Sequence, residues 1–276
     1  MELPKRIRKF FYHPFVVRKI NCLNLRVPMR KLYYLLTKPK DNKKRMSFLG
    51  IDAFFLVDNP LKLRLVETPF TEGMGDETTA LKKLLSYINF LDVIYDIGAN
   101  IGIYTVFMAK KTGPQGKVVA FEPESISFIS LQENINLNLL NNVIPIKVAL
   151  GSDFSQRGLY SNGATGDFSL LDKSKKRFFQ KVTIVDGDVF IRQRNLPLPD
   201  VVKIDVEGYE YYVLQGLKKA LIEKKCRLVF CEIHSTLLPK QITSEDVISL
   251  LRSYGFNKVE VYPRGETLHA FCYKSR

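Results

Sequence analysis

The sequence predicts an α/β fold built on a doubly wound, mostly parallel sheet. Three observations lead to this prediction. From residue 93 onward, short runs rich in β-branched and aromatic residues alternate with segments of helical periodicity. The first run ends in a small-residue turn, Gly98 to Gly102, and a helical pattern follows at once. The last two runs, residues 258–262 and 268–273, flank Pro263-Arg264-Gly265-Glu266, which indicates an antiparallel hairpin closing the sheet.

The other elements follow from the same patterns. Residues 53–57 and 61–66 flank Asp58-Asn59-Pro60, and in the second run Leu61, Leu63 and Leu65 alternate with Lys62 and Arg64, which predicts a hairpin. An apolar stripe predicts a helix over residues 77–89. Residues 151–200 break the alternation, and we expect loops and an added hairpin there. The remaining predicted strands are residues 117–122, 143–150, 201–206 and 227–233, and the remaining predicted helices are residues 125–140, 209–222 and 245–254.

Size and composition indicate one α/β domain with additions. The chain has 276 residues, of which 46% are hydrophobic. Its four cysteines form no CxxC pair, which argues against a disulfide framework or a zinc finger and favours a reducing compartment. Neither an apolar signal region nor a run of about 18 apolar residues is present. We therefore expect a cytoplasmic protein that does not span a membrane.

The positive charge is concentrated near the N-terminus. Residues 1–50 contain 14 Lys and Arg against two acidic residues, whereas the whole chain carries only +14. The rest of the chain is therefore close to neutral, which disfavours an active site for nucleic acid. We predict a basic N-terminal arm with short helices and a hairpin over residues 1–75, followed by one catalytic domain over residues 76–276.

Two roles remain open for the basic arm. Its basic clusters alternate with aromatic and aliphatic residues, and Pro14 and Pro28 stand where a first helical turn tolerates proline. Residues 38–45 are expected to be a polar linker. Residues 1–45 could lie on an anionic membrane surface, where each basic residue contributes about 1 kcal/mol to the free energy of membrane binding. The alternative is a helical cap that packs on the main domain with a solvated basic face.

The glycine turn predicts a site for a nucleotide-type cofactor. Glycines allow close approach of the backbone, and the following helix N-terminus offers free N–H groups. Asn100 occupies the place of the second glycine of a dinucleotide fingerprint, which disfavours NAD. Asp96 would repel a pyrophosphate but suits a cationic amino acid group, and Glu122 can accept hydrogen bonds from both ribose hydroxyls. The alternative is an ordinary βα turn with incidental glycines.

Several ordered blocks of residues extend the pattern of the glycine turn. They are Asp96 to Gly102 with Thr105, Phe121-Glu122-Pro123-Glu124, Val202 to Gly208 with Glu210, Val213-Leu214 with Gly216, and Glu232-Ile233-His234. In these blocks the chain resembles the FkbM family of S-adenosyl-L-methionine-dependent methyltransferases. The resemblance covers about residues 76–276 and is weak before them. It implies a Rossmann-like class I methyltransferase fold, with a seven-stranded sheet whose last strand is antiparallel, and O-methylation of sugars, glycolipids or polyketide-type products.

The resemblance also implies a set of residues that bind S-adenosylmethionine. Asp96 would bind the methionine portion directly or through water, and Glu122 would bind the ribose. The methionine portion would also contact Gly98, Asn100, Gly102 and Thr105, and the adenine would lie beside Pro123 and the strand end at Val148 and Ala149.

Methyl transfer requires that the acceptor oxygen be aligned with the methyl group and lose its proton. His234 is the first candidate for the base, because an unperturbed imidazole is neutral at pH 7. Asp205 or Glu232 would orient it or hold acceptor hydroxyls. A divalent metal on Asp205, Glu207, Glu232 and His234 is a less favoured alternative, so no metal is predicted. A strand-capping role for His234 and a helix N-terminal role for Glu207 and Glu210 are the structural alternatives.

The expected partner is a hydroxylated small molecule or glycan. Residues 151–180 are expected to form the wall on the acceptor side, and His13 and His269 are poorer catalytic candidates. A nucleic-acid methyltransferase is the competing function of the same fold, but the chain has no Asn/Asp-Pro-Pro-Tyr/Phe motif. A catalytically idle fold that binds a membrane or protein is another alternative, and an NAD oxidoreductase is disfavoured by Asn100.

Overall fold

The computed structural model describes residues 26–67, 77–161, 168–170 and 177–275. The chain divides into two compact units, residues 1–78 and residues 79–276. Among the described residues, no helix has both the length and the apolar character needed to cross a membrane.

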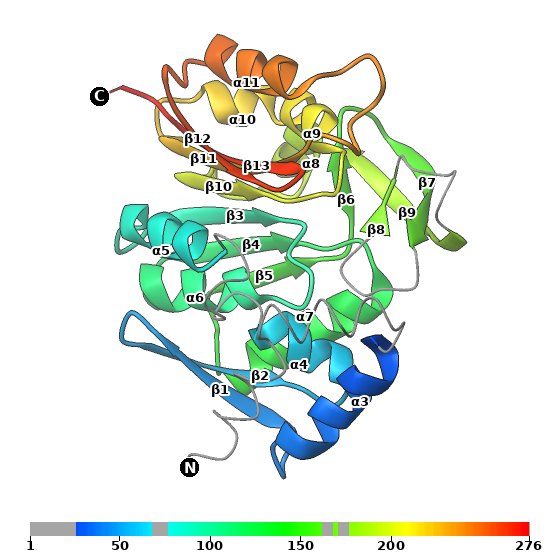
Figure 1. Ribbon diagram of the computed structural model, residues 1–276. Coiled ribbons are helices and arrows are strands. Elements are labelled where there is room, and N and C mark those ends of the chain that lie inside the picture. Colours follow the sequence, from blue (N-terminus) through cyan, green and yellow to red (C-terminus); the bar gives the residue numbers. More distant parts are fainter. Residues whose placement is uncertain (1–25, 68–76, 162–167, 171–176, 276) are drawn as a thin grey trace. The chain divides into compact units, whose positions relative to one another are not determined.

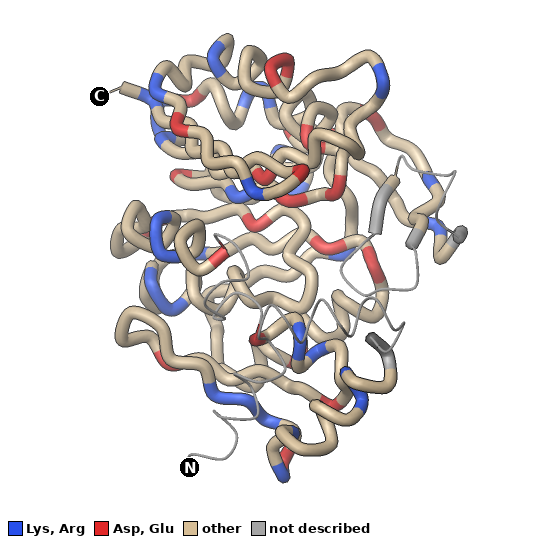
Figure 2. Tube along the Cα trace, in the orientation of Figure 1, with Lys and Arg blue, Asp and Glu red and all other residues tan. Residues whose placement is uncertain are grey.

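The first unit combines two helices with a two-stranded hairpin. Its elements are α3 (Arg26–Thr37), β1 (Lys43–Phe48), β2 (Ile51–Leu56) and α4 (Pro60–Glu67). Strand β1 pairs antiparallel with β2, and several residues of β1 are basic (Figure 2). Glu67 is buried, and it accepts a hydrogen bond from the Tyr33 hydroxyl at 2.6 Å and pairs with the Lys44 ammonium at 2.7 Å. Helices α3 and α4 are thereby tied to the hairpin.

The hairpin predicted over residues 53–57 and 61–66 is wrong. The second segment is helix α4, because Pro60 fits a first helical turn and the Asn59 side chain caps it. The Asn59 Oδ1 atom accepts hydrogen bonds from the amides of Leu61 at 3.0 Å and Lys62 at 2.9 Å. The true partner of β2 is β1, which includes residues 43–45 of the expected linker. Pro28 lies in the first turn of α3 as predicted, whereas Pro14 lies outside the described residues.

A seven-stranded sheet forms the centre of the second unit (Figure 1). In spatial order its strands are β12 (Lys258–Arg264), β13 (Thr267–Tyr273), β11 (Leu228–His234), β10 (Val201–Ile204), β3 (Val93–Ile97), β4 (Lys117–Phe121) and β5 (Val143–Ile146). The pairs from β11 to β5 are parallel, and β13 runs antiparallel to both of its neighbours. The predicted mostly parallel sheet with a terminal hairpin is confirmed.

Helices cover both faces of this sheet. Tyr104 packs on Phe230 on one face, with ring centroids 6.3 Å apart. On the opposite face Val213 and Val247 pack in the same core as Cys231, the residue after Phe230. The first face carries α6 (Ile103–Thr112) and α7 (Ser125–Leu137), and α5 (Glu77–Tyr87) precedes β3. The second carries α8 (Gly187–Gln193), α9 (Glu210–Gly216), α10 (Lys218–Ile222) and α11 (Ser244–Ser253).

A smaller sheet of four strands lies after β5. Its spatial order is β6 (Ala149–Gly151), β9 (Arg177–Asp186), β7 (Ser155–Ser161) and β8 (Phe168–Ser169). The β7–β9 pair confirms the added hairpin, but the single strand predicted over residues 143–150 is wrong. The chain turns at Val148, whose amide donates to the Ile146 carbonyl, and β6 then pairs with β9 instead of β4. Helix α8, which the sequence analysis missed, begins at a cap in which the Asp186 side chain accepts from the Val189 amide.

The predicted helix over residues 209–222 is divided into α9 and α10 at Leu217. Gly216 approaches the backbone of Gly151 so closely that a Cβ atom on it would lie 1.6 Å from the Gly151 carbonyl oxygen. Only glycine permits this contact between α9 and β6, which fixes the smaller sheet beside the end of the larger one.

Candidate active site

The glycine turn joins β3 to α6 at the carboxyl edge of the sheet. Gly98, Asn100 and Gly102 all have positive φ angles, of +78°, +51° and +88°. A Cβ atom on Gly98 would lie 1.8 Å from the Asp205 carbonyl oxygen, so this position requires glycine. The amides of Gly98 and Ala99 both donate to the Phe121 carbonyl at 3.0 Å. The turn is thereby held against the ends of both neighbouring strands, β4 and β10.

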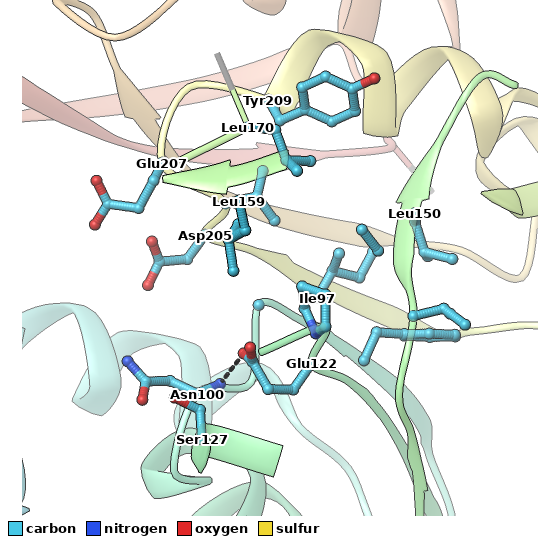
Figure 3. Close-up of a pocket in the computed structure, with 16 residues that line it drawn as sticks. Ile97, Asn100, Glu122, Ser127, Leu150, Leu159, Leu170, Asp205, Glu207 and Tyr209 are labelled. Atoms are coloured by element: carbon cyan, nitrogen blue, oxygen red, sulfur yellow. Dashed lines mark hydrogen bonds between the residues drawn. The ribbon is translucent and has the colours of Figure 1, made fainter. Parts of the chain in front are cut away.

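Glu122 follows β4 and fastens the turn from the other side. Its Oε2 atom accepts a hydrogen bond from the Asn100 amide at 2.8 Å (Figure 3). Its Oε1 atom accepts one from the Glu124 amide at 2.8 Å. Burial raises the pKa of the Glu122 carboxyl to about 7, although both hydrogen bonds oppose this shift. A buried carboxylate therefore stands at the strand end, next to the glycine turn.

A pocket opens between the glycine turn, Glu122 and the smaller sheet (Figure 3). Counted with its opening to solvent, it contains about 680 Å³ of empty space. Small-molecule sites are clefts lined mostly by apolar groups, with a few polar groups that fix the orientation of the ligand. Its lining residues are Ile97, Gly98, Asn100, Phe121, Glu122, Pro123, Ser127, Val148, Ala149, Leu150, Leu159, Leu170, Asp205, Val206, Glu207 and Tyr209.

Eight of the residues to which the sequence analysis assigned a role line this pocket. They are Gly98, Asn100, Glu122, Pro123, Val148, Ala149, Asp205 and Glu207. Gly102 lies instead against Leu131 of α7, where a Cβ atom would be 2.6 Å from the Leu131 Cδ1 atom. Asp96 and Thr105 are fully buried and also lie outside the pocket lining.

Lys203 joins β10 to the glycine turn, and the sequence analysis missed it. Lys203 and Asp96 are cross-strand partners in the β10–β3 pair. The Lys203 ammonium lies 3.2 Å from Asp96 Oδ1 and 3.5 Å from Asp205 Oδ2, and donates to the Gly98 carbonyl at 3.0 Å. Thr105 donates to the other Asp96 oxygen at 2.5 Å. Lys203 is 3% exposed, and a lysine inside an apolar strand was the available signal.

The charges around Lys203 keep it protonated. Burial by itself would lower the pKa of the Lys203 ammonium, but the carboxylates of Asp96 and Asp205 raise it overall. The fully buried Asp96 is therefore matched by a buried cation and does not face the pocket as an isolated charge. This pair fixes the position of both Gly98 and Asp205.

A carboxylate–imidazole cluster, formed by Asp205, Glu207, Glu210 and His234, lies where β10 and β11 end. The His234 Nδ1 atom is 2.8 Å from Glu210 Oε1. Its Nε2 atom is 3.8 Å from Asp205 Oδ1 and 3.7 Å from Glu207 Oε1. Asp205 and Glu207 also line the pocket, and Figure 3 shows their carboxylates pointing to the same side. The cluster is thus in contact with the pocket through these two residues.

His234 differs in charge from the sequence-based expectation. Burial lowers its pKa, but the hydrogen bond to Glu210 and the charges of Glu207 and Asp205 raise it to about 10. The expectation of an imidazole that is neutral at pH 7 was wrong for this arrangement of charges. The error came from treating His234 with the unperturbed pKa, because the sequence does not show how many carboxylates the turn after β10 brings to it.

Glu232 is not among the residues that line the pocket. Its Oε1 atom accepts a hydrogen bond from the Arg264 guanidinium at 3.0 Å, and its Oε2 atom lies 3.5 Å from His269 Nε2. Burial would raise the pKa of the Glu232 carboxyl, but His269, His234 and Arg264 lower it to about 2. Glu232 therefore links β11 to the β12–β13 hairpin.

Comparison with known proteins identifies the family. The family model described as "Methyltransferase FkbM domain" matches residues 96–258, which is more than half of the chain. The chain belongs to this FkbM methyltransferase family. The strand order, with its antiparallel β13 next to β11, is that of a Rossmann-like class I methyltransferase fold.

Individual relatives share part of the chain. The hexuronic acid methyltransferase AglP of Haloferax volcanii is 31% identical over 172 residues, covering 60% of this chain and 66% of the relative. Methyltransferase 1 of Beauveria bassiana is 30% identical over 144 residues, covering 45% of this chain and 57% of the relative. The chain thus aligns with about three fifths of the length of these relatives.

One solved structure of an FkbM methyltransferase, from Methylobacillus flagellatus KT, matches with a TM-score of 0.48 and 17% identity, over 67% of this chain and 44% of that chain.

The residues of the pocket fit S-adenosylmethionine. The pocket offers a buried carboxylate that can accept hydrogen bonds from a diol, apolar walls at Phe121 and Leu150 for a flat ring, and a glycine turn for the amino acid end. The carboxylates of Asp205 and Glu207 at its edge suit a cationic group better than a pyrophosphate. These groups suit S-adenosylmethionine, the cofactor of the family.

Proposed function

We propose that this chain is an O-methyltransferase that uses S-adenosylmethionine to methylate a hydroxyl of a saccharide, glycolipid or related natural product. The observation that supports the proposal most is that Glu122 and two members of the carboxylate–imidazole cluster, Asp205 and Glu207, line the same pocket. Glu122 suits a ribose diol, and Asp205 and Glu207 suit a hydroxylated acceptor. The name of the relative AglP, a hexuronic acid methyltransferase, supports a saccharide acceptor.

In this proposal Glu122 binds the ribose hydroxyls, and Pro123 and Ala149 lie beside the adenine. Gly98 and Asn100 hold the methionine portion through the backbone of the turn. Asp96, Gly102 and Thr105 act indirectly, because their side chains or backbone fix the turn from below. When bound, the cofactor would supply a methyl group activated by a sulfonium, whose sulfur leaves as a neutral thioether when the S–CH3 bond breaks.

The chain's own residues then position the acceptor and take its proton. Asp205 and Glu207 line the pocket and can accept hydrogen bonds from an acceptor hydroxyl. As the new O–CH3 bond forms, the hydroxyl proton passes to the carboxylate–imidazole cluster. The charge of His234 balances the carboxylates, so we assign it a positioning role in place of the base role. Alignment of the acceptor lowers the activation barrier by several kcal/mol, and removal of its proton raises the rate by about 10²–10⁴-fold.

The test is methyl transfer from labelled S-adenosylmethionine to a panel of acceptors. The panel contains neutral glycosides, uronic acid glycosides, a glycolipid extract and a random oligonucleotide. The proposal predicts label on a saccharide or glycolipid, lost in Asp205→Asn and retained in Glu245→Gln, a matched change at an exposed carboxylate on α11. Label on the oligonucleotide alone would contradict the proposal and support the nucleic-acid alternative.

Attachment of residues 1–45 to an anionic membrane surface is a second proposal. It is supported by helix α3, on which Leu32, Leu35 and Leu36 are 44%, 65% and 53% exposed beside basic residues. Such a helix can insert its apolar side between anionic headgroups. Co-sedimentation with phosphatidylserine vesicles should be reduced in the triple variant Leu32→Ser/Leu35→Ser/Leu36→Ser. Equal sedimentation of both proteins would contradict this proposal.

A further inference from the structure

We infer that Asp205, Glu207 and His234 form a binding site for one divalent cation at the acceptor side of the pocket. One ligand atom from each of these residues lies within 4.8 Å of the ligand atoms of the other two. The donor set is two carboxylate oxygens and one imidazole nitrogen. Such a mixed set suits a divalent ion such as Mn²⁺, which accepts both oxygen and nitrogen ligands.

The distances match the size of such an ion. The His234 Nε2 atom lies 3.8 Å from Asp205 Oδ1 and 3.7 Å from Glu207 Oε1. Both separations are too long for a hydrogen bond. The ligand atoms of the three residues all lie within 4.8 Å of one another, so, given these two separations, a point no more than about 2.4 Å from each exists, within the range of about 2.0–2.6 Å for metal ligands. The site therefore needs little rearrangement to admit a cation, which binds as the proton leaves His234 Nε2.

The imidazole is oriented as metal-bound histidines are. His234 is 7% exposed, and its Nδ1 atom is 2.8 Å from Glu210 Oε1, so Nε2 is directed toward Asp205 and Glu207. Glu210 is fully buried and holds the imidazole in place. A carboxylate on the far nitrogen of a ligating histidine is the usual second contact of metal sites. This buried, directed nitrogen distinguishes the cluster from a surface group of acidic residues.

The first carboxylate is also oriented by a separate contact. The Asp205 Oδ2 atom lies 3.5 Å from the Lys203 ammonium, which leaves Oδ1 on the side of His234. Glu207 has a φ angle of +53° and lines the same side of the pocket. Glu232 also approaches His234 Nε2, at 4.0 Å, but its oxygens pair with Arg264 and His269. We therefore assign three ligands to the site and leave Glu232 out.

The role of the cation rests on the proposed function. Asp205 and Glu207 line the pocket in which we place the acceptor, so an acceptor hydroxyl could complete the coordination. A cation that binds a hydroxyl oxygen lowers its pKa, so that its proton leaves more readily. The same cation would neutralise the two carboxylates, which would otherwise repel an anionic saccharide.

Binding of Mn²⁺ to the full-length chain tests the site without any methyl transfer. The bound fraction is read from the loss of the free-ion electron paramagnetic resonance signal. We expect one bound ion per chain, with affinity reduced at least about tenfold in Glu207→Gln and in His234→Gln. Glu245→Gln on α11 is the matched control and should bind as the wild type does. The side chain of Glu207 is 22% exposed, so the Glu207→Gln variant is expected to fold. It therefore tests the site even if His234→Gln fails to fold.

Two results would overturn the inference. One is the absence of Mn²⁺ binding, and the other is equal affinity in wild type and Glu207→Gln. Calorimetric titration with S-adenosylmethionine on the same samples separates this inference from the proposed function. Cofactor binding without Mn²⁺ binding refutes the cation site alone, whereas Mn²⁺ binding without cofactor binding refutes the proposed function and supports the site.

Discussion

Replacing Lys203 with methionine should destabilise the second unit strongly. The substitution keeps the length of the side chain but removes the cation from Asp96, which is fully buried, and from Asp205. Removing one partner of a buried ion pair typically costs about 3–5 kcal/mol, because the other charge stays buried and unpaired. For a unit of this size each kcal/mol lowers the melting temperature by about 2–4 °C, so a decrease of about 10 °C is expected. Urea unfolding followed by circular dichroism measures the free energy.

A double variant separates the ion pair from simple loss of packing. Lys203→Met/Asp96→Asn removes both charges and should recover part of the lost stability. Lys111→Met at the exposed end of α6 is the matched control and should change the unfolding free energy by less than about 0.5 kcal/mol. A loss below about 1 kcal/mol in Lys203→Met, or no recovery in the double variant, would refute the role of this pair.

Three further predictions concern Glu122, the glycine turn and the contact of Glu232 with the β12–β13 hairpin. Burial raises the pKa of Glu122 to about 7, and the ribose diol requires the ionised carboxylate. The affinity for S-adenosylmethionine, measured by calorimetry, should therefore fall about tenfold from pH 8 to pH 6. An affinity of the wild type that does not change with pH would contradict this. Gly98→Ala should lower the free energy of unfolding in urea by more than about 2 kcal/mol, because the Cβ atom would lie 1.8 Å from the Asp205 carbonyl oxygen. Gly50, which also has a positive φ angle but no described atom within 4 Å of an added Cβ, is the control. A loss in Gly98→Ala no larger than that in Gly50→Ala would argue against the close contact. Glu232→Gln should lower stability through Arg264 but leave cofactor affinity unchanged, and weakened binding would place Glu232 in the site.

The sequence predicted the sheet well because its signals are local. Buried parallel strands read as short apolar runs, and the glycine turn marks the first of them. The errors arose where tertiary pairing decides the structure. Residues 61–66 alternate in polarity, yet the Asn59 cap makes them a helix. Residues 143–150 form one continuous run, yet β6 finds its partner in β9, more than thirty residues later.

The candidate site was predicted in part for a related reason. Glycine and carboxylate positions at strand ends are visible in the sequence, and Glu122 and Asp205 do line one pocket. The charge state of His234 and the pairing of Lys203 with Asp96 depend on strand register and on the turn after β10. The pattern of residues does not contain these distances, so the neutral imidazole was inferred wrongly and Lys203 was overlooked.

The most direct test of the central claim is calorimetric titration of the full-length chain with S-adenosylmethionine, in parallel with Glu122→Ala. The account predicts one binding site in the wild type. It predicts at least about tenfold weaker binding in the variant, because a charged hydrogen-bond acceptor for the ribose is lost. Absence of binding to the wild type, or equal affinity in a folded Glu122→Ala variant, would contradict the account.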